Sequence, residues 1–295
     1  MQPLLTIGVP AYDEWDKVER LLLSLDGQKT DAVLEIVLID DCHPDDLQTK
    51  VRRSFPHVNT RRNTVNRGPA HNRNCIIEMA RAPYIAFFDA DCIIPSNWVE
   101  TVRPHLAPHR LISGCVIRTD GSLEWGPRHT TWLGVSRPCP AVKANVASSN
   151  NMIVATAMAR CIGGFNENLR IYFEDSLFSL NFRQAGGEIL YLAEGKVFHN
   201  HHSLRNPGRL RLQSRNTLWA MHHYYRNAPL LQRACSAGLT LNYLSKAIGS
   251  VLRGETDFTR AYLGGIVDGY RQIHSGRWRD SWITPGTTDV QSAKA

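Results

Sequence analysis

The stretch YIAFFDAD, residues 84–91, joins a short apolar run directly to two acidic residues. A run of this length and composition is typical of a buried β-strand, so Asp89 and Asp91 stand at the end of a predicted strand over residues 84–88. If the strand breaks between them, both carboxylates lie close enough to share one divalent cation with a diphosphate. Oxygen-rich sites of this kind favour Mg²⁺ or Mn²⁺. The triplet Asp89-Ala90-Asp91 alone often occurs by chance, so the neighbouring motifs decide whether it indicates a metal site.

Upstream of this stretch, predicted strands alternate with predicted helices. The strands cover residues 4–9, 34–39 and 59–62, and the helices cover residues 17–25 and 70–80. This alternation predicts an α/β fold whose central sheet is mainly parallel, with right-handed crossovers. In such sheets, ligands bind outside the carboxyl ends of the strands. Acidic pairs follow the first and second strands, which indicates a site shared by several strand ends; they are Asp13, Glu14, Asp40 and Asp41.

The pattern changes after Pro95. We expect a strand over residues 114–119, a loop-rich segment over 120–144, a helix over 175–185, two short strands over 189–192 and 196–199, and mostly helix over 210–271. These elements divide the chain into a catalytic domain (1–202, with a nucleotide-binding half of about 1–95 and an acceptor-binding half of about 96–202), a basic helical region (203–280) and a flexible tail (281–295).

Composition and charge narrow the function class. Apolar residues make up 43% of the 295 residues and charged residues 21%, which is ordinary for a globular protein. The chain lacks both the roughly 20-residue apolar run of a membrane span and a signal peptide, and its seven scattered cysteines suit reduced thiols, so we expect a cytoplasmic protein.

The positive charge is concentrated in the C-terminal third. Between Ser203 and Arg279, twelve Arg or Lys stand against three Asp or Glu. Such a region suits phosphate-bearing ligands, an anionic membrane surface or a plain solvated face. No nucleic-acid-binding motif accompanies it, so we expect no nucleic acid partner.

Two further sites add candidates for chemistry. Glu174 and Asp175 open a predicted helix, where the dipole stabilises acids, and either could also act as a general base. His199 ends a short strand and could supply an imidazole to a metal. The neighbouring histidines, at 201, 202, 222 and 223, leave zinc as a minor alternative, although their spacing matches no usual zinc pattern.

Seven motifs in order resemble those of family 2 glycosyltransferases with the GT-A fold, over roughly residues 4–225. They are TIGVPAYDE (6–14), LIDDC (38–42), NRGPAHNRN (66–74), FFDADC (87–92), GGFNENL (163–169), YFEDSLF (172–178) and VFH (197–199). Three positions depart from the family pattern: Asp13 replaces an Asn, Asn72 stands where Ala is common, and Leu177 stands where many relatives carry a further acid.

The resemblance implies a role for each matching residue. The nucleotide pocket would be lined by Pro10, Ala11, Tyr12, Glu14, Asp40, Asp41, Asn66, Arg73 and Asp89. Asp91 would bind the metal directly, Asp89 would lie on the ribose side or touch a metal-bound water, and His199 would assist. Asp175, with Glu174 beside it, would supply the catalytic base. The acceptor or the transferred sugar would face Asn150 and Asn151. Apart from the resemblance, Trp125 and Trp132 of the loop-rich segment could stack on a sugar or be half-buried core residues. The series Arg205, Arg209, Arg211 and Arg215 could close over the diphosphate, hold an acceptor phosphate or form a solvated face.

These roles imply a metal-dependent, inverting hexosyltransferase. It would use Mn²⁺ or Mg²⁺ and a nucleoside-diphosphate sugar, and its acceptor would be a polysaccharide or other carbohydrate, a lipid-linked sugar or a small natural product. The basic helices could pack on the catalytic domain, form a homodimer or contact the inner face of a membrane. Two rival hypotheses are a sugar nucleotidyltransferase, which would want a glycine-rich loop in place of Pro10–Glu14, and a non-catalytic nucleotide-sugar or polysaccharide-binding module.

Overall fold

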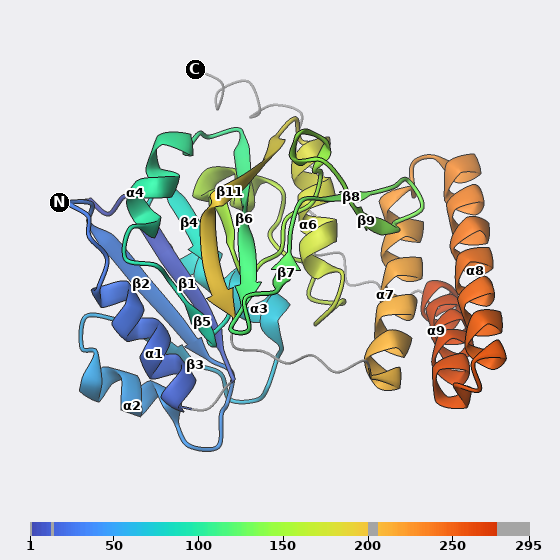
Figure 1. Ribbon diagram of the computed structural model, residues 1–295, viewed down its shortest axis with the longest axis horizontal. Coiled ribbons are helices and arrows are strands. Elements are labelled where there is room, and N and C mark those ends of the chain that lie inside the picture. Colours follow the sequence, from blue (N-terminus) through green and yellow to red (C-terminus); the bar gives the residue numbers. More distant parts are fainter. Residues whose placement is uncertain (1, 13–14, 200–205, 276–295) are drawn as a thin grey trace.

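The structure is a computed structural model that describes residues 2–12, 15–199 and 206–275. A curled central sheet occupies one side of the molecule, helices cover both of its faces, and three long C-terminal helices stand beside it (Figure 1). The predicted boundary at residue 202 and the predicted tail over 281–295 lie outside the described residues.

The N-terminal half consists of the alternating elements that the sequence predicts. Its elements are β1 (Leu5–Ala11), α1 (Trp15–Asp26), β2 (Leu34–Asp40), α2 (Leu47–Ser54), β3 (Asn59–Arg62), α3 (Pro69–Met79), β4 (Tyr84–Phe87), β5 (Cys92–Ile93) and α4 (Trp98–Val102). The helices α2 and α4 fall in segments for which the sequence predicts no helix.

The second half is more irregular. Its strands are β6 (Arg110–Arg118), β7 (Leu123–Trp125), β8 (Arg128–Thr130), β9 (Ser136–Pro138), β10 (Met152–Ala155) and β11 (Glu188–His199). Its helices are α5 (Thr156–Cys161), α6 (Glu174–Gln184), α7 (Pro207–Tyr224), α8 (Pro229–Leu252) and α9 (Thr256–His274), and 3₁₀ turns cover Arg103–His105 and Ala141–Lys143. The two predicted short strands are one long strand, β11, whose pairing with β6 shifts between Leu192 and Val197.

The sheet is mixed rather than mainly parallel. Its order is β3-β2-β1-β4-β10-β6-β11-β5, with β7 paired to β6, and the hairpin β8–β9 forms a separate sheet. Strands β1 to β4 pair in parallel, whereas β10 runs antiparallel to both of its neighbours. Parallel strand ends therefore gather at one edge in the N-terminal half, and β10 brings the second half alongside them.

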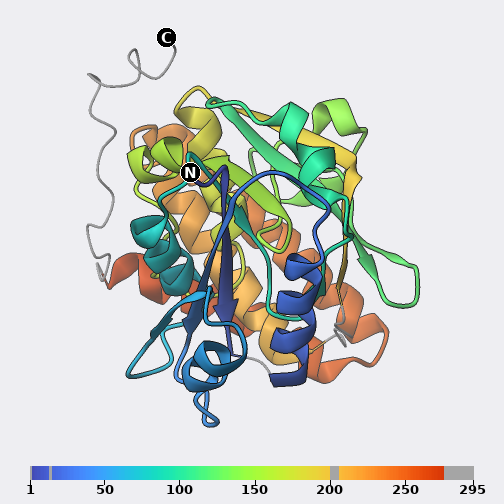
Figure 2. The same cartoon turned by 90° about the vertical axis from the view of Figure 1, so that its left-hand side faces the viewer.

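A separate hydrophobic core covers each face of the sheet. Along β2, Leu38 faces the core beneath α1 and α2, while Val37 and Ile39 face the core beneath α3 and α6. Burial on both faces explains why the strands read as continuous apolar runs. A turn of the molecule by 90° places α7–α9 behind the sheet (Figure 2).

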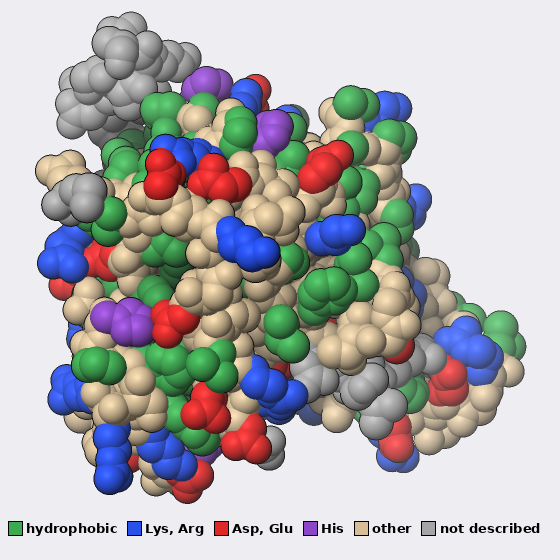
Figure 3. Space-filling model, turned by 60° about the vertical axis from the view of Figure 1, so that its left-hand side comes forward, with side chains coloured by type: hydrophobic (Ala, Val, Ile, Leu, Met, Phe, Trp, Pro, Cys, Tyr) green, Lys and Arg blue, Asp and Glu red, His purple; other side chains and the backbone are tan. Residues whose placement is uncertain are grey.

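The helices α7–α9 pack on one another around a third core that includes Leu218, Leu239 and Tyr262. None of the described helices is long and apolar enough to cross a bilayer. On the face that Figure 3 shows, acidic and basic side chains are interspersed.

Candidate active site

The described residues enclose a cavity of about 650 Å³ outside the carboxyl ends of β1 and β4. It extends from the sheet to the helices α7 and α8. Most of the predicted site residues line it: Pro10, Ala11, Tyr12, Asp41, Arg73, Asp89, Asp91, Trp125, Asn150, Glu174, Asp175 and His199. The structure thus brings together side chains that lie up to 189 residues apart in the sequence.

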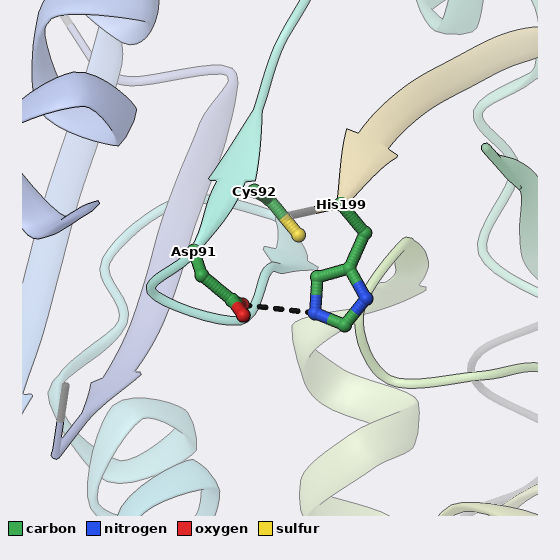
Figure 4. A group of neighbouring side chains, drawn as sticks. All are labelled: Asp91, Cys92 and His199. Carbon is green, nitrogen blue, oxygen red and sulfur yellow. Dashed lines mark hydrogen bonds and ion pairs between the residues drawn. The ribbon is translucent and has the colours of Figure 1, made fainter. Parts of the chain in front are cut away.

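Sheet pairing places Asp91 beside His199. Strand β5 runs antiparallel to β11, with Cys92 opposite His199. Asp91 directly precedes Cys92, and its carboxylate points at the imidazole (Figure 4). Asp91 Oδ1 lies 2.9 Å from His199 Nε2, and both side chains are buried. The other ring nitrogen, Nδ1, lies 3.0 Å from both carboxylate oxygens of Glu124 on β7.

The environment of His199 favours a positive charge. Burial by itself would lower the pKa of the imidazole, but the hydrogen bonds to Asp91 and Glu124 outweigh burial and raise that pKa to about 10. A carboxylate on the far ring nitrogen is the usual support of a metal-binding histidine, because it fixes the tautomer and orients the ring. A cation that takes the place of the proton at Nε2 would meet the Asp91 carboxylate, while Glu124 would keep its contact with Nδ1.

The donor atoms around His199 suit a hard or borderline cation. One oxygen of Asp91, the imidazole and the Cys92 thiol lie within 4.8 Å of one another. Burial raises the pKa of the Cys92 thiol well above its ordinary value, and its sulfur donates to the Asn150 carbonyl, so it stays a neutral neighbour. A carboxylate with an imidazole fits Mn²⁺ well, because that ion accepts both ligand types.

A buried arginine links the acidic triplet to the helix that carries the other acids. Arg73 Nη2 donates to Asp89 at 3.1 Å, and its Nη1 donates to Glu174 at 3.0 Å. Burial raises the pKa of Glu174 to about 7, with the charge of Asp175 adding to the effect and Arg73 opposing it. Glu174 is therefore held between α3 and α6 as part of the framework of the site.

The side chain of Asp175 is more exposed than that of Glu174. Its side chain is only half buried and lines the cavity, where Oδ1 accepts from the Ser176 amide at 2.6 Å. Burial raises its pKa, and Arg73 opposes that shift. A carboxylate that faces a cavity with a raised pKa has the properties of a general base.

The backbone before these acids is strained. Arg170, Tyr172 and Phe173 have φ values of 50°, 68° and 75°, a region that side chains other than glycine rarely adopt. The buried amide of Asn216 on α7 donates to the carbonyls of Leu169, Ile171 and Tyr172, at 3.1, 2.7 and 3.0 Å.

Through these three bonds, α7 holds the strained segment in one conformation. Backbone strain at functional sites persists only where the surroundings fix it. The amide of Asn216 therefore sets where α6 begins and where its first acids point.

Two of the predicted nucleotide-binding residues do not line the cavity. Asp40 is fully buried, accepts from the amides of His43 and Gln48 and pairs with Arg62. Asn66 accepts from Arg170. Asp41 does line the cavity, although its oxygens already accept from Asn63, Arg67 and Gly68.

Two predicted acceptor residues also lie elsewhere. Trp132 is 51% exposed and away from the cavity. Asn151 is buried, and its amide donates to the carbonyls of Cys115 and Gly195. Glu14 and Arg205 lie outside the described residues.

Several lining residues were not predicted from the sequence. They include Glu124, Arg128, Tyr172, Asn242 and Lys246. Glu124 carries no motif, and its role follows only from the pairing of β7 with β6, which places it behind His199. Arg128, Asn242 and Lys246 reach the cavity through the packing of β8 and α8, which local patterns do not encode.

Comparisons with known proteins bear on the family and the fold of the chain. The model of the family described as glycosyl transferase family 2 matches residues 6–162. A Haemophilus influenzae protein described as an uncharacterized glycosyltransferase is 34% identical over 95 residues, which cover 32% of each chain. The present chain thus spans about a third of the length of that relative.

Two solved structures share the fold at low sequence identity. The mannosyltransferase PcManGT from Pyrobaculum calidifontis, in complex with GDP-Man and Mn²⁺, has a TM-score of 0.61 at 17% identity, over 92% of this chain and 88% of that one. GalNAc-T7 with UDP, GalNAc and Mn²⁺ has a TM-score of 0.60 at 17% identity, over 79% and 51%. These likenesses confirm the predicted fold class.

Proposed function

Because the chain belongs to glycosyl transferase family 2, we propose that it transfers a sugar from a nucleoside-diphosphate sugar to an acceptor hydroxyl, with inversion at the anomeric carbon. A divalent cation would assist at Asp91 and His199, and Asp175 would act as the general base. The observation that carries the proposal is that the Asp91–His199 pair and the half-buried Asp175 face one cavity at the carboxyl ends of parallel strands.

The donor would lie on the sheet side of this cavity. Pro10, Ala11 and Tyr12 continue β1 into the lining, and Asp41 follows β2. Tyr12 is 55% exposed, and its ring, which meets the His43 ring edge to face at 5.7 Å, could stack on a nucleobase. Asn150 supports a place for the sugar, because its buried Oδ1 accepts from no described residue and could accept from a sugar hydroxyl.

The metal assignment rests on the donor atoms and on the solved relatives. Asp91 and His199 would hold the cation, with Glu124 orienting the imidazole and Asp89 on the ribose side. PcManGT and GalNAc-T7 were both solved with Mn²⁺, which supports Mn²⁺ over Mg²⁺. When bound, the cation would supply positive charge to the departing nucleoside diphosphate.

The chain's own residues would carry the proton and hold the geometry. Asp175 would take the proton from the hydroxyl group of the acceptor substrate. As it does so, the hydroxyl oxygen would form a bond to the anomeric carbon, and the bond between that carbon and the diphosphate oxygen would break. Burial favours this step, because it raises the proton affinity of the Asp175 carboxylate. Arg73 keeps Glu174 and Asp89 in place on either side, and no covalent enzyme intermediate is needed.

The test compares metal-dependent release of nucleoside diphosphate by the wild-type protein and by Asp91→Ala. The donor is first chosen by thermal stabilisation with UDP and GDP sugars in the presence of Mn²⁺. We expect at least a hundredfold loss of turnover in Asp91→Ala and none in the exposed control Asp45→Ala, whose carboxylate pairs with Lys50. Unchanged turnover in Asp91→Ala would overturn the metal assignment.

The same assay separates the two rival hypotheses. A nucleotidyltransferase would release pyrophosphate from a nucleoside triphosphate instead. A binding module would bind the donor and release nothing.

The surface of α8 is consistent with the two partners predicted from the sequence, a second copy of the chain and a membrane. Its outward side exposes a row of apolar residues, namely Leu230, Leu231, Leu241, Leu244, Ile248, Val251 and Leu252. An apolar row of this kind is consistent with a homodimer or with peripheral membrane contact. Sedimentation with and without anionic vesicles distinguishes the two, and a cytoplasmic location with such contact stays a prediction.

A further inference from the structure

The cavity is divided by charge. Carboxylates gather on the side of the sheet and α6, where Asp89, Asp91, Glu124, Glu174 and Asp175 line the wall. The part of the lining made by β8, α7 and α8 contributes the cations Arg128, Arg209 and Lys246. A nucleoside diphosphate with its metal accounts for the acidic side and leaves the basic side without a ligand.

The three cations have aromatic and neutral partners. Arg128 lies over the ring of Trp125, at 5.3 Å from its centre, and donates to Ser136. Arg209 lies over Tyr172 at 4.9 Å and donates to its hydroxyl, and Lys246 lies over Tyr243 at 5.4 Å. Within the parts of the chain that the structure describes, none of the three forms an ion pair with a carboxylate.

The surroundings disfavour two of these charges, those of Arg128 and Lys246, when no anion is bound. Burial lowers the pKa of both Arg128 and Lys246, and the neighbouring charge of Arg137 lowers that of Lys246 further. An anion bound beside Arg128 and Lys246 would offset the cost of burying their charges.

An uncharged hydrogen-bond donor in the same part of the lining also indicates a binding site for an anion. Asn242 lies one turn before Lys246 on α8 and lines the cavity, and its amide nitrogen Nδ2 is buried without a hydrogen-bond partner among the described residues. Buried donors of this kind are rare unless a ligand or water satisfies them. With Lys246 and Arg209, this nitrogen adds a third side chain that can donate hydrogen bonds.

We propose that Arg128, Arg209, Lys246 and Asn242 form a subsite for a phosphate group carried by the acceptor. The proposal rests on the proposed function, because it assigns the sheet side of the cavity to the donor. A phosphate suits the subsite better than a carboxylate does, since it can carry two negative charges and has more acceptor oxygens for several separate donors. Arg209 contacts Tyr172, three residues before Asp175, so the phosphate would bind next to the catalytic base.

The experiment measures binding of inorganic phosphate to protein already saturated with Mn²⁺ and with UDP or GDP, whichever stabilises it more. Calorimetric titration of the wild-type protein should detect a phosphate site that remains when the nucleotide is bound. We expect Lys246→Gln and Arg209→Gln each to weaken phosphate binding at least tenfold, while the nucleotide dissociation constant changes less than threefold. The matched control is Arg233→Gln, an exposed arginine on α8 outside the cavity, which should leave phosphate binding unchanged.

Three results would overturn the proposal. The first is that the nucleotide-saturated wild-type protein binds no phosphate. The second is that the variants weaken nucleotide binding instead of phosphate binding, which would assign the cations to the donor diphosphate. The third is that glucuronate binds as tightly as phosphate, which would remove the phosphate assignment. If the protein binds no nucleotide at all, the proposed function fails, and phosphate titrated into the free protein still tests the subsite. Thermal unfolding of each variant shows that the fold is intact.

Discussion

Replacing Asn216 by alanine removes the three hydrogen bonds that its side-chain nitrogen donates, as well as the two that its oxygen accepts from the neighbouring Arg215. The nitrogen donates to the carbonyls of Leu169, Ile171 and Tyr172, and the residue is fully buried. At a net value of about 1 kcal/mol for each donated bond, the loss of these three alone should lower the free energy of unfolding by about 3 kcal/mol. In a chain of this size that corresponds to a fall in the melting temperature of roughly 6–10 °C.

The same change should reduce catalysis. The segment that Asn216 holds contains Tyr172 and Phe173 with positive φ, directly before Asp175. Once released, the segment can relax, and a displacement of the base by about 1 Å can lower a rate by about a hundredfold. We therefore expect a fall of between ten- and a hundredfold in the rate of nucleoside diphosphate release, with the donor KM within threefold of the wild-type value.

Two variants serve as controls for this prediction. Gln232→Ala removes a single amide bond, to the His222 carbonyl, and should lower the free energy of unfolding by only about 1 kcal/mol with no effect on turnover. Asn216→Asp keeps the shape but sets an oxygen against three carbonyls, so it should be at least as damaging as alanine. If Asn216→Ala unfolded within 1 kcal/mol of the wild type at full turnover, the reasoning would be refuted.

Further predictions concern the acids and the metal. The pKa of Glu174 rises from its ordinary value of 4.5 to about 7, so between these pH values the folded protein holds a proton that the unfolded chain has lost. This contribution to stability is complete below pH 4.5 and is lost as the pH rises through 7, by about 3 kcal/mol. In chemical unfolding at several pH values, Glu174→Gln should flatten that dependence, and an unchanged profile would contradict the assignment. Glu124→Gln should weaken Mn²⁺ binding by roughly ten- to a hundredfold in a calorimetric titration, because the carboxylate no longer orients His199; equal affinity would show that Glu124 plays no part in the metal site.

The sequence predicts the N-terminal half closely. The strands that precede Asp41 and Asp89 are buried on both faces, so their apolar runs are continuous and end where the acids begin. The motifs around Asp91, Asp175 and His199 place each residue at the end or start of an element, and the structure brings all three to one cavity.

Long-range pairing limits what the sequence can predict in the second half. The antiparallel insertion of β10 makes the sheet mixed, and no local pattern distinguishes it from another parallel strand. Glu124 comes from a segment for which the sequence predicts a loop, and it reaches His199 only because β7 folds back on β6. The packing of α7 and α8 likewise decides which basic residues face the cavity and which face solvent.

The central claim is that Asp175 removes the acceptor proton beside a cation held by Asp91 and His199. The most direct test is Asp175→Asn, assayed for both donor binding and turnover with Mn²⁺. We predict that the variant binds the donor within threefold of the wild type while turnover falls by roughly a hundred- to ten-thousandfold. Turnover within about threefold of the wild type would contradict it.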